Sequence, residues 1–549
     1  MALSIISAIQ ALRGSDIVAI LLFIFVVQLI KNSHTRVHTT KLQGPPSENF
    51  FVGLFPAIAG VDEPLKAFEK WAKQYGTVFS LPMGFGRQDI MIWDIKAAAH
   101  ILARDTFVYQ QSSFSRVFLD NMFGKGILSA EHDDHHRHRK ALTPAFSNAA
   151  IRGYVNTFND SAEKLKATWD AILDSGEDTI EVQQWMNRLA LENLGVAGFS
   201  HHFGALSSQD TNFKPDIMEF FDSFEAPQKS SLFSRIFFFL APIFPALLYL
   251  PTQSTLLMRR AKYSMKGIAD ALLERMKREM MIDSGDEKAG GSDKSIIGLL
   301  IKAESSSCSL TMTPDEVLAQ MVGHQNTLFF AGYETTSNTL TWALIELCRH
   351  PEVQEKLREE LNQLGGDPTW EQITLGLPYL DAVTQEVLRM HMPVDNLMKE
   401  TQKDDVVPLS KPIHTSTGEL VSELVVTKGQ VVHIPIGFIN NSEQIWGPDV
   451  KEFKPERWLD PETTLTSDAK AIQGHHHIMT FSDGPRLCLG RHFALANFKT
   501  SLANLIRRYT FEMPNGKDTV VERHLSILPR PKLAGEKGPS VPLKVRRID

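Results

Sequence analysis

The sequence predicts a mainly α-helical fold with one small β region, and three observations support this. Helical patterns dominate from about residue 63 to about residue 395. The pattern changes between about Thr401 and Gly437 to short Val- and Ile-rich runs, with Gly418 and Gly429 as breaks. A last helix is expected after a glycine-containing loop near residue 490. Without a visible internal repeat, a single large domain is the most economical arrangement.

The composition is that of a globular protein, with 43% hydrophobic and 22% charged residues over 549 positions. Lys and Arg total 57 against 64 Asp and Glu, and the net charge of −7 argues against nucleic acid as a partner. The 3 cysteines are scattered and form no CxxC pair. A disulfide scaffold is therefore not expected, and the body of the protein should face a reducing compartment.

The N-terminus differs from this average. Residues 17–30 are apolar except for Gln28, and they predict a single membrane span near 16–31 within an anchor at 1–33. A cleaved signal peptide is the alternative, but no small-residue cleavage site follows. Basic residues after the apolar run place the rest of the chain on the cytosolic side.

A hinge at 34–48 is expected to separate the anchor from the body at 49–549, because Gly44-Pro45-Pro46 cannot continue a helix.

The clearest helix is predicted from its ends. Thr313 and Glu316 can form a capping box around Pro314, and the His350-Pro351 step ends the helical pattern. The 36 residues from Pro314 to Arg349 would span about 54 Å. A helix of this length crosses a whole domain, so its apolar middle should be buried on several sides.

The stretch "FSDGPRLCLG", residues 481–490, sets Cys488 apart from the other cysteines. Gly484 permits a tight turn, and the start of a helix after Gly490 would stabilise a thiolate, as would Arg486. A buried apolar cysteine, a nucleophile and a metal ligand are all possible. A nucleophile needs a neighbouring base, which the loop does not show, whereas a ligand of a haem iron needs none.

This stretch resembles the F-x-x-G-x-R-x-C-x-G signature of the cytochrome P450 superfamily at every fixed position. Three further motifs follow the order of that family: "AGYETT" at 331–336, "EVLR" with Glu386 and Arg389, and "FKPERW" with Arg457. The resemblance extends from the anchor to about Pro529, and the chain is similar to fungal microsomal members.

The resemblance implies a haem b with Cys488 as the axial ligand of its iron. It also implies haem contacts from Phe481, Arg486, Gly490, Arg139, His135 and Lys399. Two of these positions depart from the commonest pattern. His135 stands where many relatives have tryptophan, and Lys399 stands where many have a propionate-binding arginine. Lysine lacks the bidentate geometry of arginine, so the contact expected from Lys399 is the weaker one.

The resemblance also implies catalytic and structural roles. Thr335 would hold dioxygen or a water and Glu334 would pass protons inward, while Ala331 and Gly332 would leave room for dioxygen. The alternative for Thr335 is a hydrogen bond back to its own helix. A buried structural triad is expected of Glu386, Arg389 and Arg457. For Glu386 and Arg389 the alternative is an exposed surface pair.

The substrate is expected to be a lipophilic small molecule. Its pocket would include Phe329, Phe330, Ala331 and Val394. The apolar segment 232–250 would dip into the bilayer above the entrance, with a buried core segment as the alternative. The basic residues at 135–140 would dock an acidic reductase rather than bind a metal or nucleic acid.

Together these features predict a monooxygenase held in the endoplasmic reticulum membrane by a single-pass anchor. It would use O2 and electrons from NADPH through a separate flavoprotein reductase, since the sequence has no GxGxxG fingerprint of its own. A role in fungal secondary metabolism, for example terpenoid tailoring, follows from the resemblance. Two alternatives stay open: a reductase-independent isomerisation or dehydration on the same fold, and a non-enzymatic haem-binding sensor.

Overall fold

The computed structural model describes residues 38–47, 49–54, 64–207, 314–524 and 528–548, with single positions outside these ranges. Within this part of the chain no helix has the length and apolarity needed to cross a membrane. The predicted anchor at 1–33 and nearly all of the segment 232–250 lie outside the described residues. The described residues form two compact units, which are presented separately below.

The first unit holds the chain up to Arg104 together with residues 108–110 and 397–435. It is built mainly of strands, with a five-stranded sheet in the order β1-β2-β8-β5-β3 and a separate hairpin of β6 and β7. Its elements are α4 Pro64–Tyr75, β1 Val78–Pro82, β2 Gln88–Ile92, α5 Ile95–Ala103, β3 Tyr109–Gln111, β5 Leu397–Thr401, β6 Asp405–His414, β7 Leu420–Val426 and β8 Val431–Ile434. Only β2 and β8 run parallel among the strand pairs described in this sheet.

The small β region predicted between Thr401 and Gly437 is confirmed as strands β6 to β8. Gly418 and Gly429 both adopt a φ of 86°, a left-handed conformation that favours glycine and lets the chain reverse between strands. Strands β1 and β2 were not predicted. Their residues are mostly buried, and a short apolar run with no exposed alternation cannot be told from a helix by its periodicity.

Part of the predicted hinge contacts the hairpin of this unit. The Thr40 backbone N–H donates to the Val425 carbonyl at 2.9 Å, and the hydroxyls of Thr39 and Thr427 are 2.8 Å apart. Residues 39 and 40 therefore lie along β7.

The second unit contains the remaining described residues and is mainly helical. Its longer helices are α6 Ser113–Phe123, α7 His132–Leu142, α8 Asn148–Asp174, α9 Val182–Phe199, α14 Pro314–Arg349, α15 Pro351–Asn362, α16 Pro378–Met390 and α21 Arg491–Arg508. Short helices α17 Ile436–Asn441, α18 Glu443–Trp446, α19 Pro461–Thr464 and α20 Ser467–Lys470 lie between α16 and α21. The strands are β4 Thr179–Glu181, β9 Tyr509–Glu512, β10 Val521–His524, β11 Arg530–Leu533 and β12 Pro542–Arg547.

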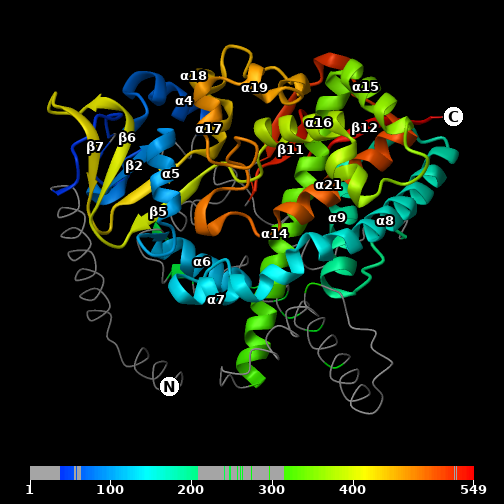
Figure 1. Ribbon diagram of the computed structural model, residues 1–549, viewed down its shortest axis with the longest axis horizontal. Helices are drawn as coiled ribbons and strands as arrows, with labels where there is room; N and C mark the ends of the chain where they lie inside the picture. Colours follow the sequence, from blue (N-terminus) through cyan, green and yellow to red (C-terminus); the bar gives the residue numbers. More distant parts are fainter. Residues whose placement is uncertain are drawn as a thin grey trace. The chain divides into compact units, whose positions relative to one another are not determined.

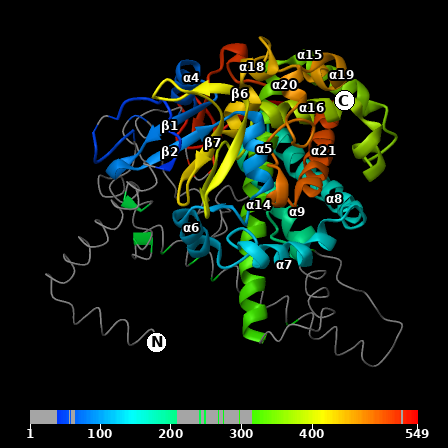
Figure 2. The ribbon, with the colours of Figure 1, turned by 60° about the vertical axis from the view of Figure 1, so that its left-hand side comes forward.

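Helix α14 has the bounds that its ends predict, Pro314 to Arg349. Figures 1 and 2 both show it passing among α9, α16 and α21, and it contacts all three. From Tyr333 to Leu347 its side chains are buried, apart from a half-buried Thr335. The sequence prediction of a helix buried on several sides is confirmed.

The strands that follow α21 were not predicted, because β10 to β12 combine Pro with several charged residues and carry a weak intrinsic β preference. Pairing holds them in place: β12 lies between β4 and β9, and β10 pairs with β11. This C-terminal segment brings Arg530 to the middle of the helical unit.

Candidate active site

The loop before α21 presents Cys488. A 3-10 turn at Gly484–Arg486 starts the loop, and Gly484 has a φ of 69°. The Cys488 backbone N–H donates to the Phe481 carbonyl at 2.9 Å, which closes the loop on itself. This hydrogen bond joins Phe481, the first residue of the motif, to Cys488.

Cys488 is accessible although it lies deep in the protein. Its side chain is exposed. Burial among the surrounding protein atoms nevertheless raises the pKa of its thiol, against the opposing effects of the Gly490 backbone N–H and of Arg139 and Arg491. The surrounding protein atoms thus favour the protonated thiol, and a bound metal cation would favour the thiolate instead.

Helix α14 has its own accessible stretch. Ala331 is exposed and Thr335 is half-buried, within a helix whose following turns are buried. The Thr335 hydroxyl donates to the Ala331 carbonyl at 2.5 Å, which is the back-bonded arrangement considered from the sequence. The hydroxyl oxygen keeps its capacity to accept a proton or a hydrogen bond from a neighbouring molecule.

Two neighbours on α14 pack against α9. A side chain at Gly332 would come within 3.2 Å of Leu194 on α9, so this glycine lets the two helices approach closely, and the room for dioxygen expected there stays a prediction. Phe329 is fully buried and stacks on Phe199 at 4.4 Å between ring centroids, so it is a core residue and not a pocket wall. Phe330 is half-buried and stacks on Phe123 of α6 at 4.5 Å.

Glu334 points away from solvent and is 1% exposed. Its Oε1 accepts a hydrogen bond from Nε of Arg530 at 2.8 Å, and this pair is buried on both sides. The predicted proton donor is thus half of an ion pair with a residue 196 positions later in the chain. The sequence offered no local signal for Arg530.

Two predicted haem-binding arginines lie near the thiol. Burial lowers the pKa of Arg139 on α7, while the neighbouring Cys488 raises it and Arg486 lowers it, so these three groups are close. His135 lies one turn before Arg139 and is buried, at 5% exposed. Lys399 belongs to the other unit, where it is 4% exposed and lies opposite Val432 in the sheet. Its contact with a haem therefore stays a prediction.

The remaining predicted positions lie as follows. Phe481 is half-buried, with its ring 5.7 Å from that of His475 in an edge-on arrangement. Gly490 immediately precedes α21, and a side chain added there would meet only the Phe146 ring at 3.7 Å. Val394 is 37% exposed.

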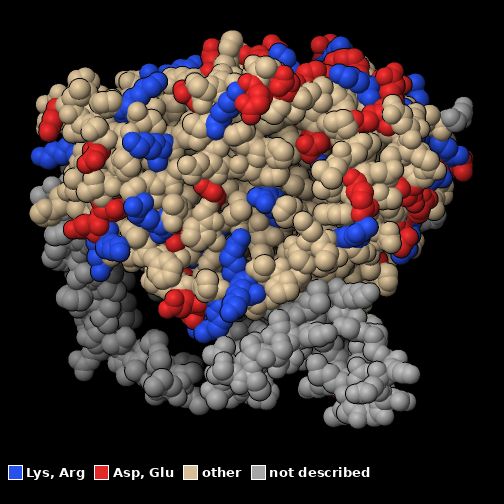
Figure 3. All heavy atoms as spheres, viewed as in Figure 1, with Lys and Arg blue, Asp and Glu red and all other residues tan. Residues whose placement is uncertain are grey.

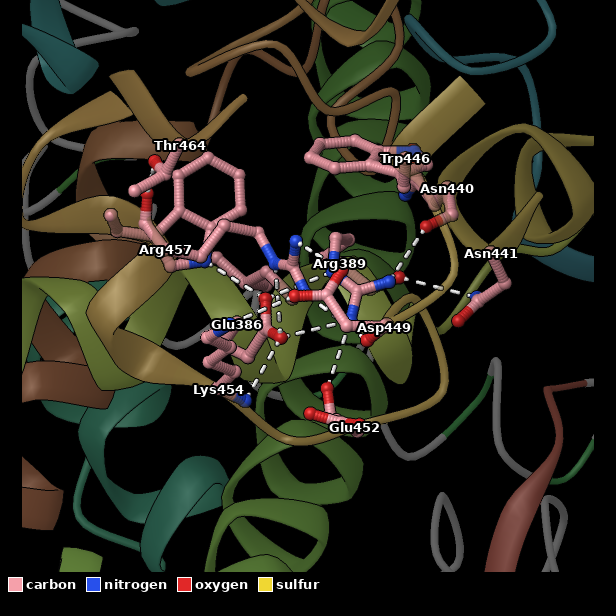
Figure 4. A network of polar contacts seen from close by, with 12 residues as sticks. Glu386, Arg389, Asn440, Asn441, Trp446, Asp449, Glu452, Lys454, Arg457 and Thr464 are labelled. Atoms are coloured by element: carbon pink, nitrogen blue, oxygen red, sulfur yellow. Dashed lines mark hydrogen bonds and ion pairs between the residues drawn. The ribbon is translucent and has the colours of Figure 1, made fainter. Parts of the chain in front are cut away.

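Glu386, Arg389 and Arg457 form one buried network, shown in Figure 4. Both Glu386 oxygens accept from Arg389, at 2.8 and 2.9 Å, and neither side chain is exposed. Arg457 lies 3.6 Å from Glu386 and also donates to Asp449 at 3.0 Å. Trp458 donates to Glu386 at 2.9 Å. The surface pair considered from the sequence is excluded.

The same network reaches the Cys488 loop through Asn440. Arg389 donates to the Asn440 carbonyl at 3.0 Å. The Asn440 side chain donates to the Thr480 hydroxyl and accepts from the Met479 backbone N–H, both at 2.9 Å. Met479 and Thr480 immediately precede the motif that begins at Phe481. This chain of contacts fixes one end of the loop to α16.

The surface over α7 carries charges of both signs (Figure 3). Asp133 and Asp134 begin the helix, Arg139 and Lys140 end it, and Arg137 is paired with Asp134 at 2.9 Å. Within the described ranges no three His, Cys, Asp or Glu side chains are grouped so that they could hold a metal ion. Helix α7 thus carries both acidic and basic residues, while its His135 and His138 are buried.

Known proteins match this chain over nearly all of its length. The sequence profile of the family described as Cytochrome P450 matches residues 43–534. The chain belongs to the cytochrome P450 family. The P450 relatives include cytochrome P450 monooxygenases claQ and claP of Ampulloclitocybe clavipes, each 48% identical over 541 residues, or 97% of this chain and 98% of the relative. Cytochrome P450 monooxygenase 128 of Postia placenta is 31% identical over 519 residues, 92% of each chain.

The predictions of a cytochrome P450 fold of fungal type and of a P450 monooxygenase are confirmed. Membership implies a thiolate-ligated haem, and the P450 site described here fits one. Cys488 supplies an accessible sulfur, Ala331 and Thr335 are accessible on α14, and Arg139 lies near the thiol.

Sequence reasoning missed the partners of the predicted residues: Arg530 for Glu334, Asn440 and Trp458 for the Glu386 network, and Asp105 and Glu131 for Arg486. Each lies far along the chain from its partner. Trp458 ends the "FKPERW" motif, so that motif could have indicated it, whereas Arg530, Asn440, Asp105 and Glu131 lie outside the four motifs quoted from the sequence.

Proposed function

We propose that this enzyme inserts one oxygen atom of O2 into a lipophilic small molecule, by hydroxylation or epoxidation. The observation that carries the proposal is the accessible, deeply placed thiol of Cys488, on a loop tied to α16 through Asn440. In this proposal Cys488 would hold the iron of a haem b through its thiolate. Electrons come from NADPH through a separate flavoprotein reductase.

A thiolate-ligated haem supplies, when bound, the activation of dioxygen for cleavage of its O–O bond. The chain supplies protons and orientation. The Thr335 hydroxyl, fixed by its hydrogen bond to Ala331, offers an oxygen that can hold a proton or a water at the accessible face of α14. Glu334 supplies the charge that draws protons inward, and the Arg530 guanidinium holds its Oε1 in place.

The substrate class follows from the accessible apolar groups. Phe330 stacked on Phe123, together with Ala331, offers an apolar wall without charged side chains. A rigid aromatic pair of this kind favours apolar molecules by excluding water from their surface. Val394 contributes to the wall in this proposal.

The cellular setting is proposed from the sequence and from the relatives. The apolar residues 17–30 support a single-pass anchor in the endoplasmic reticulum membrane, with the body on the cytosolic side. The mixed charges of α7 and the basic residues 135–140 support docking of an acidic reductase. The related monooxygenases come from fungi. A role in fungal secondary metabolism, such as the tailoring of terpenoids, completes the proposal.

Isotope incorporation tests the proposal against its two alternatives. The full chain is reconstituted with a reductase and NADPH, offered a panel of lipophilic compounds, and supplied with ¹⁸O2. One ¹⁸O atom in the product, dependent on NADPH, is the expected result. A product formed without reductase and without label would indicate isomerisation or dehydration on the same fold. Haem-loaded protein that binds CO but converts no compound would favour a sensor.

A further inference from the structure

A row of polar side chains lies on a buried face of α21. Four residues follow the spacing of a single helix face, at positions i, i+3, i+4 and i+7: Asn497, Thr500, Ser501 and Asn504. All four are buried, at 2% exposed or less. A buried polar group needs a hydrogen-bond partner, and leaving it without one costs stability. Helices α8 and α9 supply partners for some of these groups but not for all of them.

Backbone carbonyls fix the orientation of the Asn504 amide. Asn504 Nδ2 donates to the Thr500 carbonyl at 3.0 Å and to Oδ1 of Asn159 on α8 at 2.9 Å. Nδ2 of Asn159 in turn donates to the Pro368 carbonyl at 3.1 Å. A carbonyl can only accept, so neither amide can be reversed. Asn504 Oδ1 is therefore a buried acceptor, and it has no hydrogen-bond partner among the described residues.

The Thr500 hydroxyl differs from the hydroxyls of two other buried helix threonines. Thr341 and Thr384 are as deeply buried as Thr500, and each donates to the carbonyl four residues earlier in its own helix, at 2.9 and 2.6 Å. The Thr500 hydroxyl has no hydrogen-bond partner in the part of the chain that the structure describes. Thr500 and Asn504 are four residues apart, so the hydroxyl and Asn504 Oδ1 lie on neighbouring turns of the same face. One water molecule can bridge them, because it can accept from the hydroxyl and donate to the amide oxygen.

A second pair of polar groups joins α21 to α9. Asn193 Nδ2 donates to Asn497 Oδ1 at 2.7 Å, and the Ser501 hydroxyl donates to the same oxygen at 3.2 Å. Asn193 Oδ1 and Asn497 Nδ2 are both buried, and within the described ranges neither has a hydrogen-bond partner. Reversing both amides would exchange the roles of these atoms, but it would again leave one donor and one acceptor. The two amides are bonded to each other, so one water molecule can reach both remaining atoms.

We propose that the junction of α8, α9 and α21 binds two ordered water molecules. One bridges Asn193 Oδ1 and Asn497 Nδ2, and the other bridges the Thr500 hydroxyl and Asn504 Oδ1. A single molecule cannot serve both pairs, because positions 497 and 504 lie about 10 Å apart along the helix. Amides and hydroxyls carry no net charge, so a neutral ligand suits them better than an ion, whose burial costs more. The two molecules complete the contacts that hold α21, the helix that follows the Cys488 loop.

Thr500→Val tests the second water molecule by the sign of its effect, since valine has the shape of threonine without the hydroxyl. If water holds the hydroxyl, the full-length, haem-loaded variant loses hydrogen bonds. It should then unfold about fivefold faster than wild type at a fixed urea concentration, followed by tryptophan fluorescence. Thr341→Val is the matched control, because it loses a hydrogen bond to a carbonyl of its own helix. The two unfolding rates should agree within about threefold.

The opposite sign would overturn the proposal. If the Thr500 hydroxyl has no partner at all, its removal takes away a buried unpaired polar group, and Thr500→Val should unfold more slowly than wild type.

Two further measurements address the ligand directly. A crystal structure of the full chain, at a resolution that shows ordered water, should contain density for one molecule at each pair of atoms; clear density for the side chains with none between them would contradict the proposal. Exchange of choline for K+ at equal ionic strength should leave the unfolding rate unchanged, whereas slower unfolding in K+ would assign the site to a cation instead of water. None of these measurements uses O2, NADPH or a substrate, so failure here is distinguishable from failure of the proposed function.

Discussion

The buried carboxylate of Glu386 should be the most sensitive point of the network behind the Cys488 loop. Glu386→Gln keeps the shape of the side chain but replaces one acceptor oxygen by a donor NH2 group. Each Glu386 oxygen accepts two hydrogen bonds: Oε1 from Arg389 and the Lys454 backbone N–H, and Oε2 from Arg389 and Trp458. In either orientation of the amide, the glutamine oxygen keeps two of the four hydrogen bonds. The other two protein donors then face the NH2 group, which is itself a donor.

The magnitude follows from burial. Glu386 and Arg389 are 0% exposed, so the substitution leaves an uncompensated guanidinium without access to water. Removing one partner of a buried ion pair typically costs about 3–5 kcal/mol, a large part of the total stability of a domain. If this whole cost appears in the unfolding rate, haem-loaded protein should lose its Soret band about 160- to 4,700-fold faster at a fixed urea concentration.

The control is a pair with the same spacing at the surface. Asp134 and Arg137 are also three residues apart and 2.9 Å from each other, but they are 65% and 43% exposed. Asp134→Asn should cost less than about 1 kcal/mol. Equal unfolding rates for Glu386→Gln and Asp134→Asn would refute the argument that burial of this network holds the loop.

Three further outcomes are expected. Thr335→Ala should lower the rate of product formation about 100-fold, because general acid catalysis contributes on this scale, while haem content stays unchanged; an unchanged rate measured by product analysis would exclude Thr335 from proton transfer. Arg530→Gln should lower product formation by a similar factor by releasing Glu334, and Arg530→Lys should restore part of it; no rescue by lysine would argue for a purely structural role. Burial lowers the pKa of His475 to about 3, so the folded protein keeps it neutral while the unfolded chain is protonated below about 6.5. Stability should be fully present above pH 6.5 and fall as the pH drops towards 3, by about 2 kcal/mol at pH 5, and urea unfolding of His475→Gln should lack this component.

The sequence predicts well those parts of the fold and of the site that depend on residues close together in the chain. Helix α14 has capping residues at one end and a proline step at the other, so nearby residues determine where it begins and where it ends. Glu386 and Arg389 lie on one helix face because they are three residues apart. The fixed positions of the Cys488 loop all fall within ten residues.

Long-range partners could not be predicted in this way. Arg530 reaches Glu334 only because β11 pairs with β10 in the middle of the helical unit, and the charged sequence of these strands gives little β signal. Phe329 and Phe330 look alike in the sequence of a helix that is apolar on most sides. Only the packing of α9 shows that Phe329 faces the core. The contact of Gly332 with Leu194 of α9 is likewise visible only in the structure.

The most direct test of the central claim is the CO difference spectrum of the dithionite-reduced, haem-loaded protein, recorded for wild type, Cys488→Ala and Cys348→Ala. Cys348 is half-buried on α14, and burial raises the pKa of its thiol, so it serves as the control cysteine. We expect a strongly red-shifted Soret band in wild type and Cys348→Ala that is absent in Cys488→Ala. A red-shifted band that persists in Cys488→Ala, or is missing from wild type, would contradict the assignment of Cys488 as the thiolate ligand.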